Sequence, residues 1–355
     1  MAKQANLLLL WVAMAASVGC VTSSSAPIVY VSLPSTNGIQ AFRLDVNTGA
    51  LTAVVGTPFL VGDSPTSMAL SSSGQFLYVV NRSERDISLF KINSGSAKLS
   101  EVLPRAPTGL SPTALTINGG FAFVANQGSS TISIYSINGS NGALTETSSS
   151  PFLVGNLTNP GALAITPSGK FLYAASPSLS SLFLLSVDSH GNLQQLPSSP
   201  FNLAKVPVAM TIDPTGKFLY TANTDGTLSG LLIGSDGSLT AISGSPFTAG
   251  ILPSSLAVHP SGALLYVTNA GSNNISVYRI DSTSGTLTQL NSSPFPSGAG
   301  PSFVAIDPAG KFLFVCNQSA KTISQLIIES QNGALISNFT AVPTFSQPVV
   351  MVIRD

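Results

Sequence analysis

A proline-led motif recurs seven times along this chain, and its copies are almost evenly spaced. The motif consists of a proline, two residues of any type, a bulky apolar residue, one further residue and a second apolar residue. Neighbouring copies begin 46 to 48 residues apart, at Pro65, Pro112, Pro160, Pro207, Pro253, Pro301 and Pro348. A period of this length is typical of a repeat protein, in which each copy is one supersecondary unit that packs on its neighbours.

Each copy contains the patterns of four β-strands. After the proline-led strand comes an apolar segment that ends in Asn in five copies and in Ser in a sixth, at 76–81, 121–126, 171–176, 218–223, 264–269 and 312–317. Segments that are apolar on both faces are typical of strands covered on both sides. A partly alternating segment follows, and an Asn/Gly-rich hairpin then leads to a short fourth strand. Four strands in about 47 residues predict one blade of a β-propeller.

The two ends of the repeat array complement each other. The first copy, residues 28–55, has the second, third and fourth strands, whereas the last copy, residues 348–354, has the proline-led strand alone. One blade assembled from both chain ends would close the ring and remove an exposed sheet edge. We therefore predict an all-β fold, a seven-bladed β-propeller of four-stranded antiparallel blades, formed by residues 28–355 as a single domain.

The first 20 residues have the pattern of an export signal. Lys3 precedes an unbroken apolar run at 7–16, and the sequence Ser-Val-Gly-Cys then ends at Cys20. The run is too short for a permanent membrane helix, which needs about 20 apolar residues. The small residue before Cys20 resembles a bacterial lipoprotein signal, although a serine stands three residues earlier, where Leu, Val or Ile is usual. We predict a signal peptide at 1–19, a lipid anchor and linker at 20–27, and export to the periplasm or cell surface with anchoring through Cys20; the alternative is cleavage nearby and release.

The composition excludes several kinds of partner and site. Fourteen basic and 14 acidic residues cancel, and only 8% of the chain is charged, so we expect no nucleic-acid partner. Cys316, the only cysteine besides Cys20, lies in an apolar strand and is predicted to be a buried small hydrophobe. The two histidines, His190 and His259, fall in predicted turns, so the chain has too few suitable side chains for a metal site or a catalytic triad. We expect no metal, no cofactor and a monomer.

Because charge is scarce, its clustering is informative. Arg82, Glu84 and Arg85 lie between the second and third strands of one copy, and we place Arg105 on the link to the next copy. In a propeller these two kinds of segment share the rim at which ligands usually bind. One interpretation is a solvated loop with weak local ion pairs. The other is a site in which Arg82, Arg85 and Arg105 orient a carboxylate or polar ligand, with Glu84 as acid or base.

Three other repeated features are interpreted as structural. The Gly-Lys pairs at 169–170, 216–217 and 310–311 resemble fragments of a phosphate loop, but each begins a strand, so we predict hairpin turns braced by Asp213 and Asp307. The Asn that ends most second strands is expected to form a turn. Five links carry a Pro-Phe pair, whose expected role is packing between blades and whose alternative role is the stacking of sugars; the aromatic residues are Phe59, Phe152, Phe201, Phe247 and Phe295.

The motifs resemble those of a known family. The sequence Tyr-Val-Thr-Asn at 266–269 resembles the YVTN-type propeller repeats of exported surface proteins. The longer unit, with its proline-led strand, Pro-x-Gly-Lys turn and Ser-Pro-Phe link, resembles the seven-bladed lactonase family, which includes 6-phosphogluconolactonase-like and carboxymuconate-cyclase-like proteins. The resemblance covers essentially all of the chain after the predicted signal, and it implies lactone hydrolysis.

The same resemblance implies a His directly after a leading proline, with Arg and Glu nearby, facing the central channel. None of the seven positions is His in this chain; they are Thr66, Thr113, Gly161, Val208, Ser254, Ser302 and Val349. The proline-led strands also contain no charged residue before their final position. A channel without an acid–base pair argues against hydrolysis inside it.

These observations favour an exported, lipid-anchored propeller that acts as a binding or scaffold module at the cell envelope. Its expected partner is a small molecule, a saccharide or an envelope protein, and its expected contact with the membrane is the lipid anchor alone. The alternative is a lactone hydrolase that resembles 6-phosphogluconolactonase.

Overall fold

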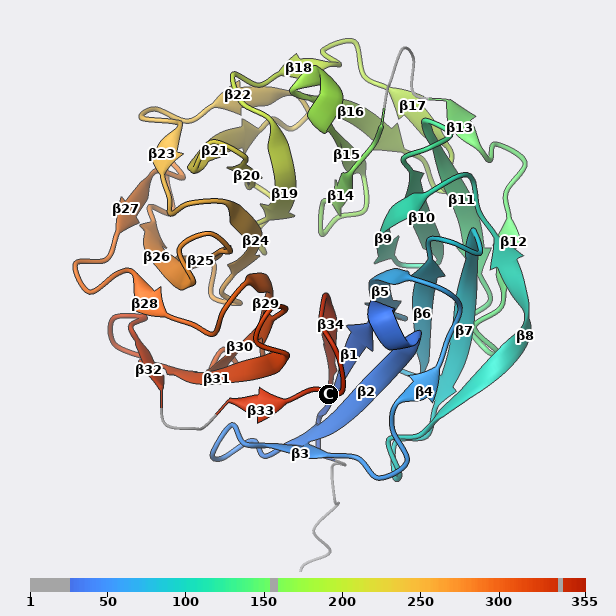
Figure 1. The fold of residues 1–355 in the computed structure, drawn as a ribbon. Helices are drawn as coiled ribbons and strands as arrows, with labels where there is room; N and C mark the ends of the chain where they lie inside the picture. The colour runs from blue at the N-terminus through green and yellow to red at the C-terminus, as the bar shows by residue number, and fades with distance from the viewer. Residues whose placement is uncertain (1–25, 154–158, 338–340) are drawn as a thin grey trace, which may run out of the picture.

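The computed structural model describes residues 26–153, 159–337 and 341–355, which form seven antiparallel sheets around a central axis (Figure 1). Each sheet is one blade, so the predicted seven-bladed propeller is confirmed. Two short 3-10 turns, η1 (Pro34–Thr36) and η2 (Pro177–Leu179), are the helical segments of the described ranges. In these ranges no helix has the length and apolar character needed to cross a membrane. Blade 1 holds β34 and β1 to β4, and blades 2 to 7 follow in chain order.

The strand bounds follow the repeat. The innermost strands are β34 (Met351–Arg354), β5 (Pro65–Leu70), β9 (Pro112–Asn118), β14 (Ala162–Ile165), β19 (Pro207–Ile212), β24 (Pro253–Val258) and β29 (Pro301–Ile306). The second strands are β1 (Ile28–Leu33), β6 (Phe76–Asn81), β10 (Phe121–Asn126), β15 (Phe171–Ser176), β20 (Phe218–Asn223), β25 (Leu264–Asn269) and β30 (Phe312–Asn317). The third strands are β2 (Gly38–Leu44), β7 (Asp86–Ile92), β11 (Thr131–Ile137), β16 (Ser181–Val187), β21 (Thr227–Ile233), β26 (Asn274–Ile280) and β31 (Thr322–Ile328).

The outermost strand differs between blades. The fourth strands are β3 (Leu51–Ala53), β8 (Leu99–Pro107), β12 (Leu144–Glu146), β17 (Leu193–Gln195), β22 (Leu239–Ala241), β27 (Leu287–Gln289) and β32 (Leu335–Ser337). Six blades add a two-residue segment that pairs with the same third strand: β4 (Phe59–Leu60), β13 (Phe152–Leu153), β18 (Phe201–Asn202), β23 (Phe247–Thr248), β28 (Phe295–Pro296) and β33 (Val342–Pro343). In blade 2, β8 is instead one continuous strand whose register shifts between Ile87 and Leu89 of β7.

The chain ends close the ring as predicted. Strand β34 pairs antiparallel with β1, which places Ile28 opposite Arg354 and Val31 opposite Met351. The Ser32 amide also donates to the Val350 carbonyl at 2.9 Å. The tail of the chain therefore supplies the innermost strand of the blade that its head begins, and the two lie side by side in Figure 1.

The hydrophobic core lies between neighbouring blades. Second strands are buried on both faces; Tyr220 of β20, for example, belongs to one cluster with Leu265 and Val267 of β25. The five link phenylalanines are partly buried against such clusters, which supports their packing role. Cys316 is fully buried, and burial raises the pKa of its thiol, as expected for a small hydrophobe.

The repeated polar residues brace the turns. Asp213 Oδ1 accepts hydrogen bonds from the amides of Lys217 and Phe218 at 2.8 and 2.7 Å, and Asp307 braces its own turn in the same way. The Gly-Lys pairs are thus turn residues, as predicted. Asn126 donates to the hydroxyls of Thr131 and Ser133 on the next strand, so the strand-end Asn joins the second strand to the third.

Candidate functional site

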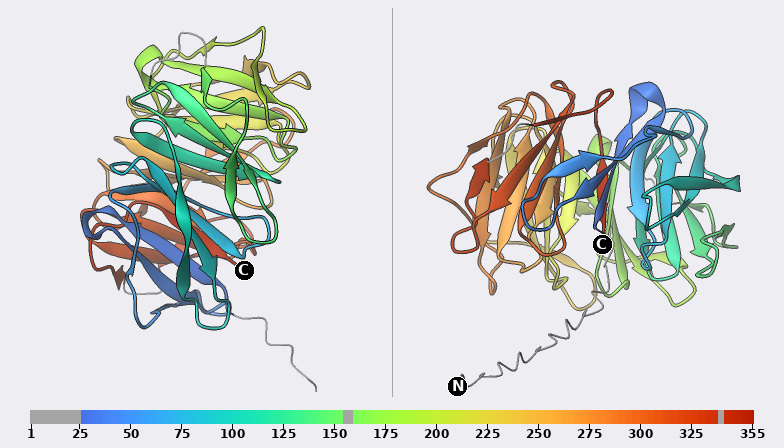
Figure 2. Two further views of the ribbon diagram at one scale, coloured as in Figure 1. Left: turned by 90° about the vertical axis from the view of Figure 1, so that its right-hand side faces the viewer. Right: turned by 90° about the horizontal axis from the view of Figure 1, so that it is seen from below.

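The antiparallel order of each blade places its loops on two opposite rims of the ring, seen edge-on in Figure 2. Loops between second and third strands share one rim with the links between blades; we call it the mouth rim. Turns between first and second strands share the other rim with the hairpins between third and fourth strands; we call it the turn rim. On the mouth rim the Arg82 amide donates to the Ser64 carbonyl at 3.0 Å, so loop 82–85 lies against link 61–64.

Hydroxyl groups join neighbouring blades beside the leading prolines. The hydroxyls directly after four of these prolines each donate to the carbonyl of the next blade's leading proline: Thr66 to Pro112 at 3.2 Å, Thr113 to Pro160 at 3.1 Å, Ser254 to Pro301 at 2.6 Å and Ser302 to Pro348 at 3.1 Å. Four of the seven positions at which the family resemblance implies a His are therefore engaged in joining blades. Because the innermost strands carry no charged side chain before Arg354, their wall offers no acid–base pair.

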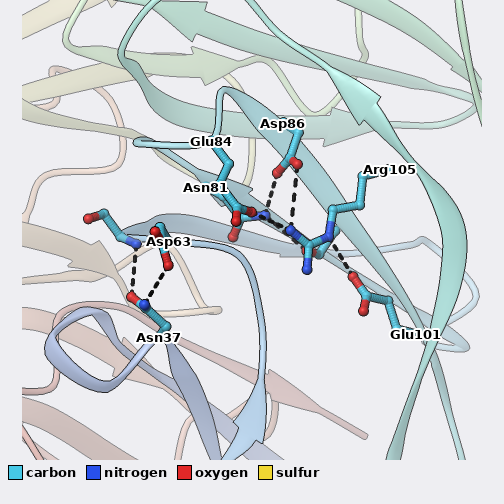
Figure 3. A network of polar contacts seen from close by, with 9 residues as sticks. Asn37, Asp63, Asn81, Glu84, Asp86, Glu101 and Arg105 are labelled. Atoms are coloured by element: carbon cyan, nitrogen blue, oxygen red, sulfur yellow. Dashed lines mark hydrogen bonds and ion pairs between the residues drawn. The ribbon is translucent and has the colours of Figure 1, made fainter.

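Arg105 lies at a different place from the one predicted. It belongs to the continuous outer strand β8 and not to a link, because β8 stays paired with β7 as far as Pro107. Its Nε lies 2.7 Å from Glu101 Oε1, and its Nη1 contacts Glu84 and lies 3.6 Å from Asp86 (Figure 3). Desolvation lowers the pKa of Arg105, but the hydrogen bond and charge of Glu101 and the charges of Asp86 and Glu84 outweigh it and raise the pKa.

These contacts separate the four candidate residues into two pairs. Arg105 and Glu84 form an ion pair at the outer edge of blade 2, so their charges already compensate each other. Arg82 and Arg85 are both exposed. Arg82 donates from Nη2 to Gln127 Oε1 of blade 3 at 3.1 Å, and within the described ranges the Arg85 side chain makes no hydrogen bond or ion pair. Guanidinium donors of Arg82 and Arg85 therefore remain available on the mouth rim.

Asp63 and Asn37 also lie at this part of the mouth rim, and neither was predicted from the sequence. Asn37 Nδ2 donates to Asp63 Oδ1 at 2.5 Å, and Asn37 Oδ1 accepts from the Ser64 amide at 3.1 Å (Figure 3). The Asp63 carbonyl accepts from the Ser83 amide at 3.2 Å, which places the exposed Asp63 beside the loop that carries Arg82 and Arg85. Its position two residues before a leading proline was the available signal, since this link lies on the mouth rim.

One pair of charges elsewhere on the mouth rim is already engaged. Across the ring, Lys205 Nζ and Asp225 Oδ2 of blade 5 form an ion pair of 2.8 Å. His259 and His190 lie on the turn rim, in a turn and in a hairpin, as predicted. Among the residues described, no three His, Cys, Asp or Glu side chains are grouped to hold a metal ion. The predicted signal and Cys20 fall outside the described ranges.

The comparisons with known proteins agree with this architecture. The family model described as "Lactonase, 7-bladed beta-propeller" matches residues 20–158, 118–231 and 235–353. A search of the curated proteins matches nothing.

Solved structures share the fold at low identity. A candidate 6-phosphogluconolactonase from Bacteroides fragilis is 24% identical, with a TM-score of 0.81 over 94% of this chain and 99% of that one. A second candidate, from Bacteroides uniformis, is 20% identical, with a TM-score of 0.82 over 93% and 99%. The Pseudomonas aeruginosa periplasmic gluconolactonase PpgL is 17% identical, with a TM-score of 0.77 over 93% and 99%. Because the family model spans nearly the whole propeller, this chain belongs to the seven-bladed β-propeller lactonase family.

Proposed function

We propose that the protein hydrolyses a lactone on the mouth rim between blades 1 and 2, with Asp63, Arg82 and Arg85 as the working residues. The observation that carries the proposal is that backbone hydrogen bonds join link 61–64 to loop 82–85, so an exposed carboxylate and two arginines with free donors lie on adjacent segments. Family membership and the lactonase names of similar structures support the choice of a lactone.

The chemistry follows from these groups. Asp63 takes a proton from water as the water oxygen attacks the lactone carbonyl carbon. The oxyanion that forms is stabilised by guanidinium donors of Arg82 and Arg85. The ring C–O bond then breaks, the proton passes from Asp63 to the departing ring oxygen, and a hydroxy acid is released. Asn37 holds Asp63 through Oδ1, which leaves Oδ2 to receive the proton.

A second candidate function is a ligand-binding module without turnover. Two observations favour it: the innermost strands lack an acid–base pair, and four hydroxyls beside the leading prolines already join blades. In this case the same arginines would bind the carboxylate of a small molecule and no bond would be broken.

A turnover assay separates the two functions. Purified protein is offered a panel of sugar and alkyl lactones, and acid release is followed by pH-stat with the Asp63→Asn, Arg82→Gln and Asp225→Asn variants. We expect Asp63→Asn to lower turnover roughly 100-fold or more, the usual range for loss of a general base. The control Asp225→Asn removes a mouth-rim carboxylate that is already paired and leaves turnover intact. Lactone binding by calorimetry without turnover in the wild type would instead support the binding module.

The cellular location of the protein is a separate part of the proposal. We propose that the chain is exported and anchored through an acylated Cys20, because a short apolar run precedes a small residue and a cysteine. Mass spectrometry of the mature N-terminus in a bacterial host would show a diacylated or triacylated Cys20, and Cys20→Ser would move the protein from the membrane to the soluble fraction. An unmodified Cys20 or a different first residue contradicts the anchor.

A further inference from the structure

A groove between blades 6 and 7 on the turn rim has the size of a small-molecule site. Its volume is about 440 Å³, within the usual range of roughly 300–1,000 Å³. The turn of blade 6 supplies one wall, the turn of blade 7 a second, and the hairpin after β31 a third. Leu264 and Ile328 supply apolar lining. The groove lies at the opposite end of the strands from the mouth-rim site.

Two cations line this groove without a carboxylate partner. Arg279 makes one long contact, from Nη2 to the Asn332 carbonyl at 3.5 Å, and within the described ranges its other donors have no partner. The Lys311 side chain makes no hydrogen bond or ion pair in the same ranges. Glu329 also lines the groove, but it accepts from Asn332 Nδ2 at 2.8 Å and pairs with neither cation. With Glu329 included, the lining still has one more positive than negative charge, and both cations are unpaired, which favours an anion.

His259 is held in a structural position beside these cations. Its Nε2 lies 2.9 Å from the Gly310 carbonyl, which can only accept, so Nε2 carries the proton. Its Nδ1 accepts from the Ser261 amide at 3.1 Å. Both ring nitrogens are therefore engaged, and the imidazole forms part of the wall while Arg279 and Lys311 keep donors for a ligand.

The equivalent groove between blades 2 and 3 shows that the fold alone does not supply these charges. That groove has a volume of about 260 Å³ and no charged residue in its lining. Ser71, Gly120 and Asn138 occupy the positions that His259, Lys311 and Glu329 hold between blades 6 and 7. The fold thus produces the groove, whereas the sequence of blades 6 and 7 makes it cationic.

We propose that this groove binds a small oxyanion, a carboxylate or a phosphate, through Arg279 and Lys311. The planar guanidinium of Arg279 matches the two oxygens of such a group, and Lys311 adds a point charge. The ligand is small, because the hairpin and the two turns enclose the groove on three sides. The site is independent of lactone hydrolysis on the mouth rim.

Calorimetry at low ionic strength tests the proposal on the purified propeller. Sodium phosphate and sodium succinate are titrated separately, so the two arms distinguish phosphate from carboxylate. We expect at least one to bind, and Arg279→Gln or Lys311→Gln to weaken it by about tenfold, the effect of losing one charge-assisted hydrogen bond. The control Lys217→Gln removes the lysine at the same turn position in blade 5 and leaves affinity unchanged.

Three outcomes would overturn the proposal. They are the absence of binding of both anions to the wild type, equal affinity in the Arg279 and Lys311 variants, and an equal loss in the Lys217 control. Thermal unfolding of each variant checks that the fold is intact. We expect no change in the unfolding temperature, because neither cation takes part in a described ion pair.

Discussion

At five of the seven joints between neighbouring blades, one tyrosine hydroxyl forms a hydrogen bond to the next blade. The hydroxyl of the second-strand tyrosine donates to a hairpin carbonyl of the following blade in five joints: Tyr30 to Ala97 at 3.0 Å, Tyr78 to Gly142 at 2.7 Å, Tyr173 to Gly237 at 3.0 Å, Tyr220 to Gly285 at 2.7 Å and Tyr266 to Gly333 at 3.1 Å. Phe123 and Phe314 occupy the same position in the other two blades. An aromatic ring therefore packs at this position in every blade, and five of the blades add a hydroxyl that bonds to the next blade.

Replacing Tyr220 by Phe tests the value of this hydrogen bond. The substitution keeps the ring and leaves the Gly285 carbonyl without its hydroxyl donor, so we expect the free energy of unfolding to fall by about 1 kcal/mol. Urea unfolding followed by circular dichroism measures the change. Thr288→Val, which removes an exposed hydroxyl from β27, serves as the control and should change stability little. An unchanged urea midpoint in Tyr220→Phe would show that the bond contributes nothing net.

At the scale of the element, the hairpin of each blade fits against the second strand of the blade before it. Gly237 has a φ of +81°, and a Cβ at this position would lie 2.4 Å from Cδ1 of Phe171. Gly119 has a φ of +56°, yet a Cβ there would meet nothing within 4 Å. Gly119 is therefore required only by its left-handed backbone conformation, whereas Gly237 is required both by its backbone conformation and by the close approach of Phe171.

Alanine at these two glycines should have different costs. Gly119→Ala imposes backbone strain alone, which costs about 1 kcal/mol. Gly237→Ala adds an overlap with the Phe171 ring, so a total loss of roughly 2–4 kcal/mol is expected. Thermal and urea unfolding of both variants measure the difference. Equal losses would mean that the hairpin shifts away from Phe171 without cost.

Elements differ in how far their sequence predicts them. The second strands begin and end as predicted, because an apolar run between a turn and an Asn fixes both limits; β6, for example, spans Phe76–Asn81. The outer strand was less predictable, since its register depends on pairing across the blade rather than on a local pattern. Arg105 was misplaced for this reason. The place of Asp63 on a mouth-rim link could be inferred from the sequence, but its hydrogen bond to Asn37 joins residues 26 positions apart, and no local pattern encodes such a contact.

At the scale of the whole molecule, the joint that closes the ring between blades 7 and 1 lacks the tyrosine hydrogen bond and is held by other contacts. Phe314 stands at the tyrosine position, and Gln325 Oε1 instead accepts from the Leu51 amide at 2.7 Å. Gln40 Oε1 accepts from the Phe345 amide at 3.1 Å. The pairing of β34 with β1 completes the joint. Because each blade packs on two neighbours, the seven joints are expected to unfold together and not one blade at a time.

The response of the ring to alkali follows from its seven tyrosines, all of which have a raised pKa because burial disfavours the phenolate. Burial raises the pKa of Tyr78, and that of Tyr135, to about 12, whereas an unfolded tyrosine ionises near pH 10. Between these values the unfolded chain holds fewer protons than the folded one, so stability is complete below about pH 10 and falls as the pH rises. At about pH 11 the folded protein should show little tyrosinate absorbance, and unfolding in urea should release it. Tyrosinate that appears near pH 10 while circular dichroism still reports intact sheets would contradict the burial of these phenols.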